Sequence, residues 1–178
     1  QPLQNLLRKQ GIDSRFLIRS GMRETHDQVW DLNDYVAWLI NELPKRQPII
    51  LLGHSFGGQL AICFAAQNPH LVDKLILVDS AGIRNNKLFP WLKRNTFFCL
   101  AKIGKFIFKA AIFRKLLYKL AREQDYYTAP KNMRETMIKV INDSVKPDLT
   151  KITCPTLIIW GKQDKVTPLW MGQEFAKK

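Results

Sequence analysis

Apolar residues recur every three or four positions over several segments of this chain, the spacing that gathers them on one face of a helix. The spacing predicts helices over residues 2–10, 31–43, 59–67 and from 169 onward. Asp31 or Asn33 is positioned to cap the second helix, and Pro44 ends it. These helices are separated by segments with a different pattern.

Short runs that are apolar throughout lie between the helices, at 48–52, 74–79 and 154–160, with a shorter run at 15–18. Runs of this length and character predict strands that are buried on both faces. Strands that alternate with helices predict an α/β fold, in which a mostly parallel sheet is covered by helices.

The turn between the second strand and the third helix carries the sequence Gly53-His54-Ser55-Phe56-Gly57, called here the elbow. A serine hydroxyl is a poor nucleophile, so it needs a base to accept its proton and donors to hold the oxyanion that forms. A Gly-x-Ser-x-Gly turn between a strand and a helix exposes the serine Oγ for this chemistry. Ser55 is therefore the candidate nucleophile, and the alternative is a tight glycine-rich turn with an incidental serine.

The residues around Ser55 have separate expected roles. Gly53 and Gly57 lack a Cβ, which allows the turn to close without a clash, and Gly58 allows the helix to approach the sheet. The backbone N–H of Phe56 is the candidate oxyanion donor, because it lies at the positive N-terminus of the helix. A phosphate-binding loop is disfavoured, since no Gly-Lys-Ser/Thr follows.

Two stretches of the chain resemble the α/β-hydrolase superfamily, of the serine-nucleophile type with a helical cap. They are Ile50-Leu-Leu-Gly-His-Ser-Phe-Gly-Gly and Cys154-Pro-Thr-Leu-Ile-Ile-Trp-Gly-Lys-Gln-Asp-Lys-Val-Thr-Pro. The resemblance covers nearly the whole chain. It implies an α/β-hydrolase core, with a mostly parallel sheet and helices on both faces, into which an α-helical cap is inserted. It implies no metal and no other cofactor.

In this family the catalytic residues follow one another as serine, acid and histidine. The resemblance therefore assigns Ser55 as nucleophile and Asp164, which follows the last predicted strand, as the acid that orients the base. Asp164 could instead be a turn-forming aspartate. Asp79, at the end of the strand at 74–79, is the rival acid, because some members of the family use that position.

The catalytic histidine is expected not to be present in this chain. His54 lies inside the elbow, His26 lies in a polar loop and His70 follows Asn68-Pro69, far from Ser55. The resemblance places the base beyond Lys178 and a second oxyanion amide before Gln1. The chain is thus expected to be a hydrolase truncated at both ends and inactive by itself.

The predicted domains are a core part at 1–83, a cap at 84–147 and a second core part at 148–178. The net charge is +13, and the cap contributes +11, from fifteen lysines and arginines and four acidic residues. Basic faces of this kind are usually solvated, so a cap over a small-molecule substrate is the first interpretation. Contact with an anionic membrane surface is the second. Nucleic-acid binding is disfavoured, because the phenylalanines lie in apolar runs and not between basic residues.

Three scattered cysteines, Cys63, Cys99 and Cys154, have no metal-binding spacing and favour reduced thiols in the cytoplasm. No run of about 18 apolar residues predicts a membrane span. The expected function is hydrolysis of an ester or related acyl bond of a small, apolar substrate through an acyl-enzyme on Ser55. A C–C bond hydrolase, an acyltransferase and a non-catalytic binding module of the same fold remain as alternatives.

Overall fold

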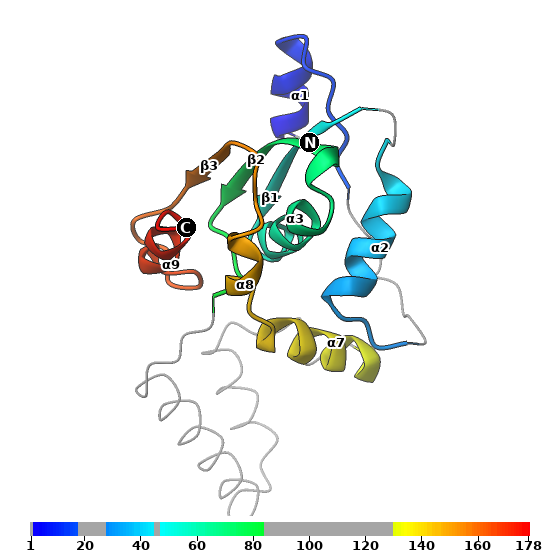
Figure 1. Ribbon diagram of the computed structural model, residues 1–178, viewed down its shortest axis with the longest axis vertical. Helices are drawn as coiled ribbons and strands as arrows, with labels where there is room; N and C mark the ends of the chain where they lie inside the picture. Colours follow the sequence, from blue (N-terminus) through cyan, green and yellow to red (C-terminus); the bar gives the residue numbers. More distant parts are fainter. Residues whose placement is uncertain (1, 18–27, 45–46, 84–129) are drawn as a thin grey trace, which may run out of the picture.

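The computed structural model describes residues 2–17, 28–44, 47–83 and 130–178 (Figure 1). Its centre is a parallel sheet of three strands in the order β1 (Ile49–His54), β2 (Val72–Val78) and β3 (Thr156–Ile159). All three correspond to predicted strands. Because parallel neighbours end at the same edge of a sheet, the segments that follow these strands lie close together.

The helices are α1 (Pro2–Lys9), α2 (Leu32–Glu42), α3 (Phe56–Gln67), α7 (Lys131–Asn142), α8 (Lys146–Leu149) and α9 (Leu169–Phe175), with a 3₁₀ turn at Pro69–Leu71. Asp31 caps α2 in a capping box, in which its carboxylate accepts the amides of Asn33 and Asp34 and the Asp34 side chain accepts the Asp31 amide. The predicted helix in this region and its first candidate cap are thus confirmed. None of the helices in the described ranges is long and apolar enough to cross a membrane.

Helix α3 packs against β1 and β2 and lies at the centre of the core (Figure 1). Ile62 and Phe64 of the helix and Leu75 and Leu77 of β2 are almost completely buried in the hydrophobic core around α3. Full burial of an aliphatic or aromatic side chain stabilises a fold by about 1.5–3 kcal/mol. The helix that begins at the elbow is therefore among the most firmly held elements of the described chain.

The expectation that the strands are buried on both faces is wrong for β1 and β3. Side chains on the face opposite α3 are between 45% and 59% exposed in these strands, namely Ile50, Leu52, Leu157 and Ile159. Burial alternates along β1 instead of being continuous. Alternation is what a strand shows when packing covers only one of its faces.

The prediction of a strand at 15–18 is wrong for residues 15–17, which form no regular structure, and residue 18 lies outside the described ranges. A strand needs a neighbour to pair its backbone groups. In the described sheet β1 pairs with β2 alone. Arg15 instead directs its guanidinium to the carbonyl and carboxylate of Glu42, at 2.8 and 2.9 Å.

Helix α7 lies in the predicted cap, 84–147, and is held to the core by polar contacts. The buried Gln59 amide of α3 donates to the carbonyl oxygens of Val140 and Asp143, at 3.0 and 3.4 Å. The ammonium of Lys139 forms an ion pair with Asp31 at 3.1 Å. Residues 84–129 of the predicted cap lie outside the described residues, and the domain boundaries stay a prediction.

Replacement of Gln59 by methionine, which has a similar shape and no donor, is expected to loosen α7. The carbonyl oxygen of Asp143 loses this donor and that of Val140 keeps only the Asp143 amide, which costs about 1–3 kcal/mol. Hydrogen–deuterium exchange should then become faster over residues 131–142, while the strands keep their protection.

Gln67→Met is the matched control, because Gln67 is an exposed residue of the same helix whose amide donates to the Asn33 side chain. Unchanged exchange of α7 in Gln59→Met, or an equal change in both variants, would contradict this account of how α7 is held.

Candidate active site

Ser55 joins β1 to α3 in an unusual backbone conformation, with φ at 53°. Its N–H donates to the carbonyl of Val78 at 3.1 Å, which continues the pairing of β1 with β2. Its carbonyl oxygen accepts three amides, from Gly58 at 3.0 Å, Gln59 at 3.3 Å and Ala81 at 3.0 Å. Left-handed non-glycine residues of this kind cluster at functional sites, where the surrounding structure holds them in place.

Two of the three glycines predicted to matter at the elbow are required by close contacts. A Cβ on Gly53 would lie 2.4 Å from the carbonyl oxygen of Gly57, and one on Gly58 would lie 2.3 Å from the Oγ of Ser80. A Cβ on Gly57 would meet nothing within 4 Å. The prediction is therefore confirmed for Gly53 and Gly58 and wrong for Gly57, which points into open space.

Phe56, the candidate oxyanion donor, is the first residue of α3. The first amides of a helix have no acceptor within the helix and face its positive end. The Phe56 ring packs edge-on against Tyr35 of α2, with ring centroids 5.1 Å apart, and Tyr35 packs in the same way against Trp30. Aromatic packing from α2 thus fixes the start of α3.

Asp164, the candidate acid, lies in the turn after β3. Its Oδ1 accepts the amides of Val166 at 2.7 Å and Thr167 at 2.8 Å. The Thr167 and Val166 amides hold the pKa of the Asp164 carboxyl below its ordinary value of 3.8, and the charge of His54 acts in the same direction. Asp164 is therefore ionised at neutral pH, the form in which a carboxylate stabilises an imidazolium.

Asp79, the rival acid, follows β2 and lies next to the same turn. Its Oδ1 accepts the amide of Gly161 at 2.7 Å, and its carbonyl oxygen accepts the Thr167 hydroxyl at 3.1 Å. A Cβ on Gly161 would lie 3.6 Å from this Oδ1 and 3.8 Å from the Cβ of Asp164. The two aspartates therefore flank one glycine at the carboxyl edge of the sheet.

The candidate bases are not assembled with these groups in the described chain. His54 and His70 are exposed, and His26 lies outside the described residues. Because side chains alternate between the two faces of a strand, His54 lies on the same exposed face of the sheet as Ile50 and Leu52. Within the described ranges, no group of three or more histidine, cysteine, aspartate or glutamate side chains is arranged to hold a metal ion.

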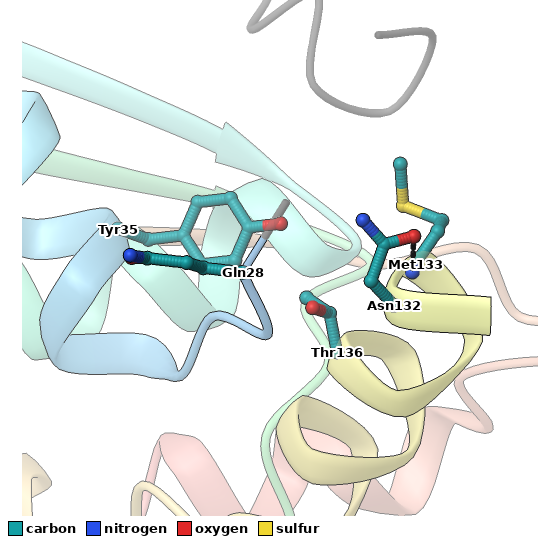
Figure 2. A pocket seen from close by; sticks show the side chains of 5 residues that line it. All are labelled: Gln28, Tyr35, Asn132, Met133 and Thr136. Atoms are coloured by element: carbon teal, nitrogen blue, oxygen red, sulfur yellow. Dashed lines mark hydrogen bonds between the residues drawn. The ribbon is translucent and has the colours of Figure 1, made fainter. Parts of the chain in front are cut away.

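A small pocket lies between α7 and the start of the α2 region, lined by Gln28, Tyr35, Asn132, Met133 and Thr136 (Figure 2). Figure 2 shows Gln28 and Tyr35 on one side of it and the three α7 residues on the other. Its volume of about 10 Å³ holds about one water molecule. The Thr136 hydroxyl also accepts the amide of Trp30 at 2.9 Å.

From the sequence alone, Tyr35, Gln59 and Thr167 are not recognisable as parts of the site. Tyr35 and Gln59 each belong to a predicted helix, where Tyr35 is an ordinary apolar-face position. Thr167 follows Asp164 by three residues, a spacing at which its amide can bond back to the aspartate. Of these three residues, Thr167 is the one that a local sequence pattern could have identified.

Comparison with known proteins points to one family. The family model for serine aminopeptidase S33 hydrolases matches residues 17–178. An uncharacterized hydrolase, YugF, of Bacillus subtilis (strain 168) is 28% identical over 159 residues, which are 80% of this chain and 58% of that protein. A 2-hydroxy-6-oxononadienedioate/2-hydroxy-6-oxononatrienedioate hydrolase of Paraburkholderia xenovorans (strain LB400) is 28% identical over 140 residues, 68% of this chain and 48% of that protein.

A solved structure of a hydrolase from Pseudomonas aeruginosa PA01 superposes with a TM-score of 0.58 at 18% identity, covering 86% of this chain and 62% of that one. This likeness shows the fold. The chain spans about half the length of the curated relatives just described.

Gly53→Ala is expected to destabilise the protein, because its methyl group would overlap backbone atoms that cannot rotate away. Overpacking of this kind costs about 1–3 kcal/mol or more, which lowers Tm by at least about 2 °C for a chain of this size. Thermal unfolding followed by circular dichroism measures the effect. Gly57→Ala is the matched control and should leave Tm unchanged or slightly raised. Equal Tm values for the two variants would contradict the steric account of the elbow.

Proposed function

The chain belongs to the serine aminopeptidase S33 family of α/β-hydrolases, and on this basis we propose that the protein hydrolyses an ester or related acyl bond through an acyl-enzyme on Ser55. The proposed substrate is small and apolar. The observation that carries the proposal is the left-handed Ser55 at the junction of β1 and α3, held by three amides on its carbonyl oxygen. This is the backbone arrangement that exposes a serine Oγ in a strand-to-helix turn.

In the proposed first step, Ser55 Oγ attacks the carbonyl carbon of the substrate while its proton passes to an imidazole base. The carbonyl oxygen becomes an oxyanion and accepts the Phe56 N–H. When the tetrahedral intermediate collapses, the bond to the leaving group breaks and the leaving group takes the proton from the imidazolium. Water then attacks the acyl-enzyme by the same route, releasing the acid and restoring Ser55.

Asp164 is the proposed acid of this mechanism. Both backbone amides that its carboxylate accepts bond to Oδ1, so Oδ2 is the oxygen assigned to orient the imidazole N–H. Its lowered pKa keeps it charged through the reaction, which stabilises the imidazolium. Neither His54 nor His70, the two histidines in the described ranges, forms a hydrogen bond with Asp164 in the structure.

Cleavage of a C–C bond is the second candidate function. The similarity to the Paraburkholderia 2-hydroxy-6-oxo dioate hydrolase supports it, and a serine nucleophile is compatible with either reaction. Acyl transfer to an alcohol differs only in the acceptor of the acyl group. Parallel assays with p-nitrophenyl esters and with a 2-hydroxy-6-oxo dioate separate ester cleavage from C–C cleavage.

A fluorophosphonate probe is expected to label the full-length protein on Ser55, because such probes react with activated serines. Ser55→Ala should abolish labelling and lower ester turnover by about 10⁴–10⁶-fold. The control Ser144→Ala, in the segment between α7 and α8, should keep both. Full turnover in Ser55→Ala would overturn the assignment of the nucleophile. Absence of labelling and turnover in the folded wild-type protein would instead favour a non-catalytic binding module.

A further inference from the structure

We propose that Asp79 is a positioning residue that holds the turn bearing Asp164, and that its role requires a hydrogen-bond acceptor and not a negative charge. The two aspartates at the ends of neighbouring strands would then have different roles, one mechanical and one electrostatic. The inference rests on the proposed function, because it treats Asp164 as the acid of the catalytic triad. It gives Asp79, the rival acid of the sequence analysis, a role other than that of the triad acid.

Asp79 contacts both ends of the turn at 161–167. Its carboxylate accepts the amide of Gly161, the first residue of the turn, at 2.7 Å. Its carbonyl oxygen accepts the hydroxyl of Thr167, the last residue, at 3.1 Å. Its own amide donates to Ile159 of β3 at 3.0 Å. One residue after β2 therefore fixes where the chain leaves β3 and where the turn closes.

Thr167 connects Asp79 to Asp164. Its amide donates to Asp164 Oδ1 at 2.8 Å, its hydroxyl donates to Asp79, and its carbonyl oxygen accepts the indole N–H of Trp160 at 2.7 Å. Thr167 is buried and its partners Asp79 and Asp164 are half-buried, so these bonds are partly shielded from competing water. A shift of Asp79 is therefore transmitted through Thr167 to the oxygen of Asp164 that faces the turn.

The backbone of Asp79 indicates that its position is imposed by these contacts. Its φ is 42°, in the left-handed region that costs a non-glycine residue about 1–2 kcal/mol. Aspartate tolerates this region better than most residues, which favours Asp or Asn at the position. The partner of its carboxylate is a neutral backbone N–H, and the amide oxygen of asparagine can accept the same donor without a charge.

Asp164 differs from Asp79 in how its bonds are made. Its Oδ1 accepts amides from its own turn, two and three residues further on, so the turn shapes itself around this carboxylate. Asp79 reaches the turn from a different strand, 82 residues away in sequence from its partner Gly161. Substitution by asparagine at each position therefore separates the need for an acceptor from the need for a charge.

The test compares Asp79→Asn, Asp79→Ala and Asp164→Asn in the full-length protein, measuring kcat, KM and deuterium exchange over residues 160–168. Asp79→Asn should keep the slow exchange of the turn, because the acceptor for the Gly161 amide is retained. Its kcat should stay within about 3-fold of the wild-type value, a change of about 0.6 kcal/mol in the barrier. Asp79→Ala should speed exchange of the turn and lower kcat by about 10²-fold, the cost typical of a misplaced catalytic group. Asp164→Asn should keep slow exchange and lower kcat by about 10⁴-fold.

A loss in Asp79→Asn as large as that in Asp164→Asn, with slow exchange preserved, would show that Asp79 needs its charge and would overturn the proposal. Unchanged exchange of the turn in Asp79→Ala would overturn it as well. The exchange measurement does not depend on catalysis. If the wild-type protein turns over no acyl substrate, the proposed function fails while the exchange results still decide the role of Asp79.

Discussion

The carbonyl oxygen of Ser55 accepts amide hydrogens from two directions, and the placement of the candidate nucleophile depends on this one atom. Gly58 and Gln59 approach it from the first turn of α3, and Ala81 approaches it from the segment after β2. The sparsely populated backbone conformation of Ser55, with φ of 53° and ψ of −120°, costs about 1–3 kcal/mol, and each of these hydrogen bonds contributes about 1 kcal/mol. The unusual conformation is therefore stable only where helix and strand meet as they do here, which explains why Gly53 and Gly58 must lack a Cβ.

The same junction organises the rest of the site. Gln59 uses its backbone to bind Ser55 and its side chain to hold the C-terminal end of α7. Asp79, at the end of the next strand, contacts the turn that bears Asp164. Parallel pairing brings these strand ends to one edge of the sheet, so residues far apart in sequence become neighbours without long loops. The nucleophile, the candidate acid and α7 are each within one or two hydrogen bonds of α3, of β2 or of Asp79, the residue after β2.

Much of this arrangement is predictable from local sequence. The runs at 48–52 and 74–79, the helix after the elbow and the cap at Asp31 depend on residues close together in the chain, where spacing and side-chain type carry the information. Exposure of Ile50 and Leu157 is not predictable in this way, because a strand's composition does not reveal what covers each face. Residues 15–17 have a strand-like composition and no described neighbour to pair with. The roles of Gln59 and Thr167 were missed because their decisive bonds join segments that only the fold brings together.

The central claim is that Ser55 attacks an acyl carbon while the Phe56 amide holds the resulting oxyanion. A crystal structure of the full-length protein after reaction with a phosphonate inhibitor, which mimics the tetrahedral intermediate, tests it most directly. The account predicts a covalent bond from Ser55 Oγ to phosphorus and a phosphoryl oxygen about 2.7–3.1 Å from the Phe56 nitrogen. An adduct on another residue, or a phosphoryl oxygen directed away from the start of α3, would contradict it.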